Sequence, residues 1–297
     1  MKTLVVLTGP TGVGKTELSL RIAEALGSPI LSCDSRQLFR EMSVGTAAPT
    51  PEQLKRVQHY FIASKSIHEP YSAAKYEVEA LSLMSTLFES HQNLLMTGGS
   101  MLYIDAVCKG IDDMPDVDPT IRQELALLYK NHGLVPILEE LKRLDPIYYK
   151  QVDQKNHKRV IHGLELCRMT GLPFSSFRKD TSKIRPFRIL KICLNRDRVE
   201  LYERIDARVD EMMLQGLETE ARGLYPFRHL NALNTVGYKE MFDYFDGNFS
   251  LEQAVTSLKF NTHKYARKQL TWFRRDTDYH WFHPEDPDII QKLNLLL

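Results

Sequence analysis

Short apolar runs separated by helical patterns organise the first hundred residues. Residues 4–7, 29–33 and 93–97 are short and largely apolar, which is typical of parallel strands buried on both faces. After the first run, Leu18, Ile22, Ala25 and Leu26 recur at helical spacing. The alternation of strand and helix predicts an α/β fold built on a parallel sheet.

The pattern changes between residues 113 and 185. A connection rich in breakers begins this stretch, with Asp113, Pro115, Asp116, Asp118 and Pro119. Apolar positions then recur at helical spacing to about residue 170, and a strand pattern returns at residues 188–194. We therefore expect residues 1–112 and 186–297 to form the α/β core with C-terminal helices, and residues 113–185 to form a helical insertion.

Three more elements are expected from local signals. Residues 60–63 are a candidate strand, and Ser72 is a candidate N-cap of a helix that runs towards Ser90. Residues 259–275 predict a final basic helix. Trp272 and Phe273 on that helix favour core packing over a base-stacking platform.

Composition narrows the class of protein. The 297 residues carry a net charge of only +1, so a nucleic-acid partner must be argued from local charge. Basic residues cluster in three places, which solvated helix faces would also explain: Lys155, Lys158, Arg159 and Arg168; Arg178, Lys179, Lys183, Arg185 and Arg188; Lys264, Arg267, Lys268, Arg274 and Arg275. The sequence has no apolar stretch of bilayer length and no signal peptide, so we expect a cytoplasmic protein without a membrane partner. The scattered cysteines predict reduced core thiols.

The most specific motif lies directly after the first strand pattern. Residues 9–16 fit the phosphate-loop pattern G-x-x-x-x-G-K-[ST] and open a helix. Glycines let successive backbone N–H groups turn towards an oligophosphate, such as that of a nucleotide like ATP, and Lys15 adds a charge. The Thr16 hydroxyl is placed to bind a phosphate-bound Mg²⁺ ion. The sequence thus predicts a phosphate site made of Gly9, Pro10, Thr11, Gly12, Val13, Gly14, Lys15 and Thr16.

The acidic residues do not fit an ordinary nucleotide hydrolase. Such an enzyme needs an acidic residue at the end of a later strand, to hold magnesium and orient water. Here the later strand ends at Thr97, Gly98 and Gly99, whereas Asp34 follows the second strand. Ligands bind at the carboxyl ends of parallel strands, so we expect Asp34 near the phosphate loop. It is a candidate magnesium ligand, hydrogen-bond acceptor or general base.

Further blocks give the chain a resemblance over nearly its whole length to the bacterial tRNA dimethylallyltransferases, also called tRNA isopentenyltransferases. The blocks are residues 9–16, 34–37 with 45–47, 98–103, 156–159 with 164–165, 204–209, 236–238 and 267–272. The chain departs from the family at Ser100, where threonine is common, and at His162-Gly163, where arginine-alanine is common. The end of the chain soon after Trp281, without a zinc-finger tail, resembles the bacterial form.

The resemblance implies transfer of a dimethylallyl group from dimethylallyl diphosphate to N6 of the adenosine next to the anticodon. The phosphate loop with Lys15, and Mg²⁺ at Thr16, would stabilise the leaving diphosphate. Arg208 matches a family arginine that binds the diphosphate. Asp34 would be the general base, and Ser100 would orient it or contact the RNA.

The same resemblance implies that tRNA is the partner and that the target adenosine leaves its stack. We expect the protein to act as a monomer. The positions that match the family's tRNA contacts are Asp34, Ser35, Arg36, Gln37, Ser100, Arg122, Gln154, Lys155, Asn156, His157 and Lys158.

Purely structural roles remain open for individual residues. Asp34 could cap a helix, and Arg208 could pair with Asp206 or Asp210 on its own helix. At the level of function, the alternatives are an isopentenyltransferase acting on free adenine nucleotide, a phosphate-loop nucleotide kinase or ATPase, and a non-catalytic RNA-binding module. Length and the basic insertion argue against the first, because a small acceptor needs neither.

Overall fold

The computed structural model describes residues 1–112, 114–115, 117–178 and 182–297. The chain forms two compact units, Met1–Cys108 with Ile184–Leu297, and Lys109–Lys183. The sequence pattern placed the corresponding boundaries at residues 113 and 185. Asp113, Asp116 and Lys179, which the sequence analysis named, lie outside the described residues.

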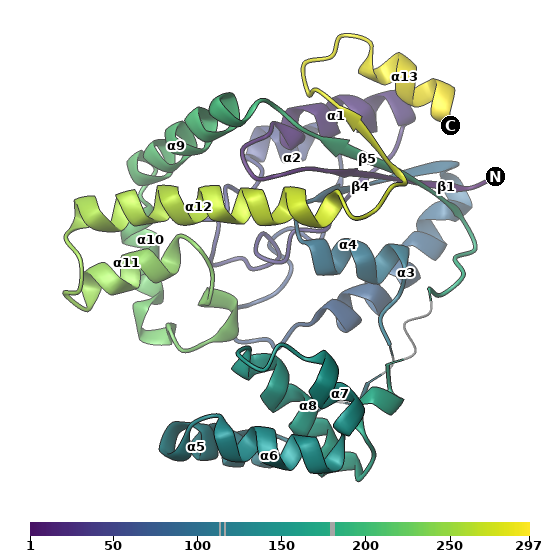
Figure 1. Cartoon of the computed structure of the whole chain (residues 1–297). Helices are drawn as coiled ribbons and strands as arrows, with labels where there is room; N and C mark the ends of the chain where they lie inside the picture. Colours follow the sequence, from purple (N-terminus) through teal and green to yellow (C-terminus); the bar gives the residue numbers. More distant parts are fainter. Residues whose placement is uncertain (113, 116, 179–181) are drawn as a thin grey trace. The chain divides into compact units, whose positions relative to one another are not determined.

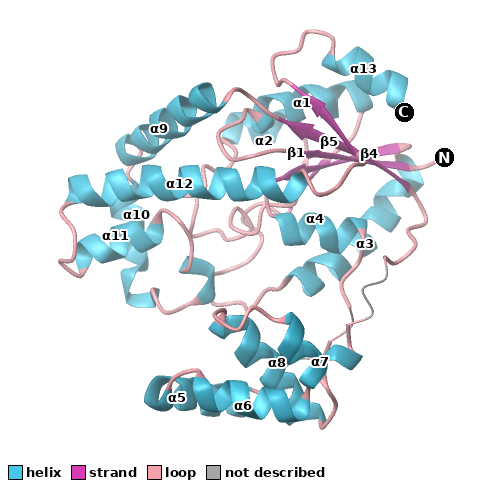
Figure 2. Cartoon of the chain, in the orientation of Figure 1, coloured by secondary structure: helices cyan, strands magenta, loops and turns pink. Residues whose placement is uncertain are grey.

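The larger unit is built on a six-stranded sheet. The strands are β1 (Thr3–Thr8), β2 (Ile30–Ser32), β3 (His59–Tyr60), β4 (Asn93–Gly98), β5 (Arg188–Leu194) and β6 (Tyr279–Phe282). Their order is β3-β2-β4-β1-β5-β6, and every neighbouring pair is parallel. Figure 2 shows the strands in magenta among the helices in cyan. The predicted α/β fold is confirmed, and the carboxyl ends of all six strands lie at one edge.

Helices cover both faces of the sheet because alternate side chains of its strands point to opposite faces. Leu4 and Val6 of β1 pack with α3 (Ala73–Ser90) and α4 (Met101–Cys108). Val5 and Leu7 pack with α1 (Lys15–Leu26), α9 (Arg198–Leu214) and α13 (Ile289–Leu296) (Figure 1). All four β1 side chains are fully buried. Burial of each of these side chains stabilises the folded state by about 1.5–3 kcal/mol. It thereby holds in place the strand that leads into the phosphate loop.

A third core lies beyond the carboxyl edge of the sheet. It joins α10 (Leu217–Leu224), α11 (Tyr238–Phe245) and the first half of α12 (Leu251–Phe273) to the end of α9 and to Leu38 and Met42. A short helix, α2 (Pro51–Arg56), also belongs to this unit. Helix α12 begins eight residues before the predicted 259, because Ser250 and Gln253 form a capping box there.

Local predictions fared differently. Ser72 caps α3, and residues 188–194 form β5, as predicted. The strand predicted at 60–63 is present but shorter and shifted: β3 covers His59–Tyr60, and it ends there because Phe61 and Ala63 have φ of 64° and 48°, which a strand does not allow. Phe273 is 1% exposed in the core, and Trp272 packs against the same cluster, so their core role is confirmed.

The smaller unit is helical. It contains α5 (Pro119–His132), α6 (Val135–Leu144), α7 (Pro146–Gln151), α8 (His157–Thr170) and a 3₁₀ turn at Phe174–Ser176. Leu125, Ile137, Leu141 and Leu164 are fully buried in its own core. The buried Asp145 carboxylate caps α7 through Tyr148 N and accepts two bonds from Ser175. The unit therefore has its own apolar and polar interior.

All four cysteines are buried thiols. Cys33, Cys108 and Cys193 belong to the larger unit, and Cys167 belongs to the smaller one. Across the described residues, the helices are too short or too polar to cross a bilayer.

Candidate active site

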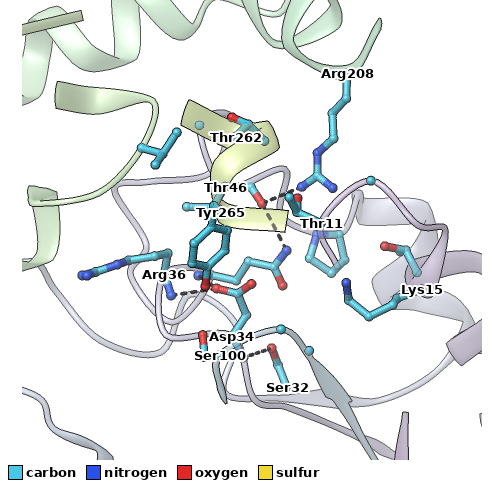
Figure 3. A pocket seen from close by; sticks show the side chains of 18 of the residues that line it. Thr11, Lys15, Ser32, Asp34, Arg36, Thr46, Ser100, Arg208, Thr262 and Tyr265 are labelled. Carbon is cyan, nitrogen blue, oxygen red and sulfur yellow. Dashed lines mark hydrogen bonds between the residues drawn. The ribbon is translucent and has the colours of Figure 1, made fainter. Parts of the chain in front are cut away.

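A cavity of about 810 Å³ opens at the carboxyl edge of the sheet in the larger unit. The loops after β1, β2 and β4 line it, together with residues of α9 and α12. Lys15 and Arg208 lie to one side of this cavity and Asp34 to the other (Figure 3). The expected meeting of Asp34 and the phosphate loop is therefore observed.

The phosphate loop runs from the end of β1 into α1. Gly12 has a φ of 80°, a conformation that favours glycine. A Cβ at Gly12 would lie 2.7 Å from Cγ1 of Ile205 on α9. The glycine therefore gives both the loop conformation and the close approach of α9. Arg204 on the same helix donates from Nε to Gly12 O at 3.1 Å.

Two cations face the cavity beside this loop. Lys15 Nζ donates to Gly9 O and Pro10 O, each at 2.9 Å. Burial, with Arg208 nearby, lowers the pKa of Lys15 to about 8. Burial also lowers the pKa of Arg208. Within the residues that the structure describes, neither buried positive group forms an ion pair with a carboxylate, and such a pair of cations favours an anion with several charges.

Arg208 does not take the pairing on its own helix that the sequence left open. Asp206 lies 2.8 Å from His263 Nε2, and Asp210 lies 2.6 Å from Lys259 Nζ. Arg208 Nη2 donates to Thr46 O at 3.3 Å. Within the part of the chain that the structure describes, Arg208 Nε is buried without a hydrogen-bond partner. An acceptor from a ligand would remove the cost of that unmade bond.

Thr16 lines the same end of the cavity, in the first turn of α1. The described residues include no group of three or more His, Cys, Asp or Glu side chains that could hold a metal ion. Magnesium commonly keeps several waters and takes few protein ligands when it rides on phosphates. One hydroxyl beside a phosphate cradle fits that kind of binding, with the remaining ligands coming from phosphate and water.

The opposite side of the cavity is formed by the turn after β2. Asp34 Oδ1 accepts from Arg36 N at 2.8 Å and from Gln37 N at 3.2 Å. Asp34 therefore caps a turn and not a helix, since α2 is the next helix after β2, and both of these bonds use the same carboxylate oxygen. Ser35 N donates to Ser100 Oγ at 2.8 Å, and Ser100 Oγ donates to Ser35 Oγ at 3.0 Å. The turns after β2 and β4 are thus joined beside Asp34.

Gln37 and Arg36 hold neighbouring loops through their side chains. Gln37 Nε2 donates to Thr46 O at 3.2 Å and to Ala47 O at 3.1 Å. Arg36 Nη1 donates to Ala232 O at 2.9 Å. Both residues line the cavity, so their predicted contact with RNA remains a prediction, beside a structural role that the sequence did not indicate.

Residues of α12 complete the cavity, and the sequence analysis gave them no role there, although Gln269 lies in the matched block 267–272. Thr262, Tyr265 and Gln269 all line it, and their spacing of three and four places them on one helix face. The Tyr265 hydroxyl points towards Asp34 (Figure 3). Burial, with Asp34 nearby, raises the pKa of Tyr265 to about 12. The phenol is therefore a neutral hydrogen-bond donor at physiological pH.

The remaining predicted tRNA contacts lie in the smaller unit. Arg122 Nε pairs with Glu165 at 3.1 Å, which ties α5 to α8. The His157 ring stacks on Tyr129 with centroids 5.0 Å apart, and Asn156 Oδ1 caps α8 by accepting from Arg159 N. The side chains of Gln154, Lys155 and Lys158 are exposed. The unit brings these residues to two adjoining helices and the turn before α8.

Comparison with known proteins identifies the family. A family model described as IPP transferase matches residues 37–276. The chain is 58% identical over 290 residues to tRNA dimethylallyltransferase 2 of Parabacteroides distasonis, covering 98% of the chain and 97% of that protein. It is 62% identical over 283 residues to tRNA dimethylallyltransferase 2 of Porphyromonas gingivalis, covering 95% and 94%. The chain belongs to the IPP transferase family.

Solved structures of this family share the fold. The tRNA isopentenylpyrophosphate transferase of Bacillus halodurans is 33% identical with a TM-score of 0.73, over 100% of this chain and 95% of that one. A eukaryotic dimethylallyltransferase, described as acting on tRNA, has a TM-score of 0.79 at 20% identity, over 100% and 78%. The second likeness concerns the fold alone. The family predicted from the motif blocks is confirmed.

Proposed function

We propose that this protein transfers a dimethylallyl group from dimethylallyl diphosphate to N6 of the adenosine 3′-adjacent to the anticodon in tRNA, releasing diphosphate. One observation carries the proposal: a single cavity has Lys15 and Arg208 beside the phosphate loop and Asp34 across from them. Cations suit a diphosphate leaving group, and a carboxylate suits the proton that the amine must lose.

The phosphate-loop side serves the leaving group. Negative charge grows on the diphosphate as the C–O bond breaks, and preorganised cations stabilise it in a site sheltered from water. Lys15 would exchange its two carbonyl acceptors for diphosphate oxygens, and the unpartnered Arg208 Nε would gain one. Magnesium held by the Thr16 hydroxyl would supply further positive charge to the same oxygens.

The Asp34 side serves the acceptor. The N6 amine of adenine is a weak nucleophile, because its lone pair is delocalised into the ring. Positioning and proton removal must therefore both assist its attack. The turn bonds from Arg36 N and Gln37 N fix the Asp34 carboxylate in the cavity. Asp34 would take the amine proton as the new C–N bond forms, with Ser35 and Ser100 holding the adjoining turns together.

A transfer assay tests this function. Labelled dimethylallyl diphosphate is offered with unmodified tRNA or with adenosine monophosphate, and Asp34→Asn is compared with the native protein. Asparagine keeps an oxygen for the turn but loses the base, so transfer should fall by about 10²–10⁴-fold while diphosphate still binds. Asp197→Asn is the matched control, because Asp197 only caps α9 through Val199 N.

The possible results of the assay distinguish the proposed function from the alternatives. Label in tRNA alone, lost in Asp34→Asn, supports the proposal. Label in the free nucleotide favours the isopentenyltransferase that acts on small acceptors. Consumption of ATP without prenyl transfer favours a nucleotide kinase or ATPase. Full activity of Asp34→Asn would show that Asp34 is not the general base.

A further inference from the structure

The side-chain amide of Gln269 joins two loops of the active site. Gln269 lies on α12 and is only 2% exposed. Its Oε1 accepts from Thr11 N in the phosphate loop at 2.9 Å. Its Nε2 donates to Gly99 O, in the turn after β4, at 2.9 Å. One buried side chain thus bridges the loops that follow two neighbouring strands.

The connection continues to the acceptor side of the cavity. Ser100 follows Gly99 directly, and its Oγ accepts from Ser35 N, the residue after Asp34. A Cβ at Gly98 would lie 2.9 Å from Asp34 N, so the turns after β2 and β4 are also in close backbone contact. A short series of contacts therefore leads from the phosphate loop through Gln269 to the turn that carries Asp34.

Only a carboxamide satisfies this bridge. Thr11 offers a backbone N–H and Gly99 a backbone carbonyl, so the side chain must accept at one end and donate at the other. A glutamate would place a second acceptor against Gly99 O, and a buried unsatisfied carbonyl is costly. Space is equally restricted, because a Cβ at Gly99 would lie 2.4 Å from Gln269 Nε2.

We propose that Gln269 is a positioning residue that sets the distance between the diphosphate cradle and Asp34. This inference rests on the proposed function. Prenyl transfer joins a carbon carried by the diphosphate to an amine held near Asp34. The separation of the two loops therefore acts on the rate of transfer rather than on the binding of either substrate alone.

Gln269→Glu tests the bridge directly. The single-turnover rate of prenyl transfer to tRNA should fall by about 10–100-fold, because small misplacements of reacting groups have effects of that size. The dissociation constant for tRNA should stay within about threefold. Because the new carboxylate would itself repel an anion, diphosphate binding is compared in the neutral variant Gln269→Met, which should show the same loss of rate and a dissociation constant for inorganic diphosphate with magnesium within about threefold. Gln253→Glu is the matched control on α12, where Oε1 accepts from Ser250 N and glutamate can do the same.

A second variant approaches the bridge from its other end. In Gly99→Ala, the new Cβ would displace the Gln269 amide, and the same loss of rate should follow. The double variant should transfer no more slowly than the slower single variant, because both changes break one connection. Melting temperatures identify any variant that fails to fold. Transfer rates are compared at a temperature below the melting temperatures of all variants.

Three results would overturn the inference: an unchanged transfer rate in Gln269→Glu, a rate loss matched by weaker diphosphate binding in Gln269→Met, or additive losses in the double variant. A native protein that transfers no label would instead contradict the proposed function. In that case, hydrogen exchange of residues 9–16 still decides whether Gln269 holds the phosphate loop. Faster exchange in Gln269→Glu supports the bridge, and unchanged exchange refutes it.

Discussion

The protonation of one buried residue, Lys15, depends on the charges around it. Its ammonium is held by the carbonyl oxygens of Gly9 and Pro10, and burial beside Arg208 lowers its pKa to about 8. Within the cavity, a diphosphate would favour the charged form and raise that pKa again. Protonation of one lysine is therefore coupled to occupation of the cradle.

The coupling predicts a pH-dependent affinity. Below about pH 8 Lys15 is already charged, so the affinity for dimethylallyl diphosphate should be flat. Above its pKa of about 8, binding must first charge the lysine, so affinity should fall by up to about tenfold per pH unit. Calorimetry at about pH 9 in buffers of different ionisation enthalpy should detect proton uptake. Lys15→Ala should lack that uptake, and a binding heat independent of the buffer in the native protein would contradict the coupling.

Individual site residues differ in how far the sequence could predict them. The phosphate-loop spacing indicates the chemistry of Lys15, whereas the roles of Asp34 and Arg208 come from the family resemblance; all three residues line the cavity. Gln269 also stands in a block that matches the family, residues 267–272, but its role could not be predicted, because its two partners lie 258 and 170 positions away. Nothing in the neighbouring sequence indicates which backbone groups a helical glutamine will meet.

Helix α10 shapes the site although it does not line the cavity. Its Glu220 carboxylate accepts from Val44 N at 2.8 Å, Gly45 N at 2.9 Å, Ser43 Oγ at 3.1 Å and the Tyr238 hydroxyl at 2.7 Å. These bonds fix the loop whose next carbonyl, that of Thr46, accepts from Arg208 and Gln37. A helix that does not line the cavity thus supports Arg208, which faces the proposed diphosphate site.

Glu220→Gln should show this support. The amide retains one acceptor oxygen and places a donor against backbone N–H groups, so the free energy of unfolding should fall by about 2 kcal/mol. Affinity for dimethylallyl diphosphate should weaken as the loop loosens. Urea unfolding and diphosphate titration measure the two effects. Glu218→Gln on the same helix removes only a surface pair with Arg222, and should cost below about 0.5 kcal/mol; an equal loss in both variants would refute the special role of Glu220.

At this scale the strands show where pattern reading succeeds. Residues 188–194 were predicted to be a strand, and they form β5. This strand lies inside the sheet, between β1 and β6. Strand β6 escaped prediction, because it is a four-residue edge strand whose His280 and Trp281 are exposed. The run at 60–63 indicated β3 but not its extent, since the strand ends at Tyr60 and Phe61 and Ala63 have left-handed φ. A strand that is buried on both faces can be predicted from its apolar sequence, whereas edge strands and turns lack that pattern.

The whole molecule divides its chemistry between two units. The phosphate loop, Asp34 and Arg208 all belong to the larger unit, whereas Arg122, Lys155 and Lys158 belong to the smaller one. The near-neutral net charge of +1 hides this division, because basic residues gather locally rather than across the chain. The helical insertion was predicted from its change of periodicity, whereas its contacts with RNA were predicted only from the family resemblance and stay predictions.

Neutralising the smaller unit should weaken RNA binding alone. In Lys155→Gln/Lys158→Gln, tRNA affinity should fall and the slope of log affinity against log salt should become shallower by about two. Affinity for dimethylallyl diphosphate should not change. Lys55→Gln/Lys292→Gln removes the same charge from α2 and α13 of the larger unit. Equal weakening by both pairs would mean that only overall charge matters; filter binding at several salt concentrations gives both slopes.

The four buried thiols give each unit a reporter of its own stability. A thiol reagent needs an exposed thiolate, so a folded unit protects its cysteines and reaction follows only when the unit opens. Cys167 reports on the smaller unit, and Cys33, Cys108 and Cys193 report on the larger one. Labelling followed by peptide mass analysis therefore reads the opening free energies of both units in the unaltered chain, with and without tRNA. No engineered probe is required, and the two units can be followed in one sample.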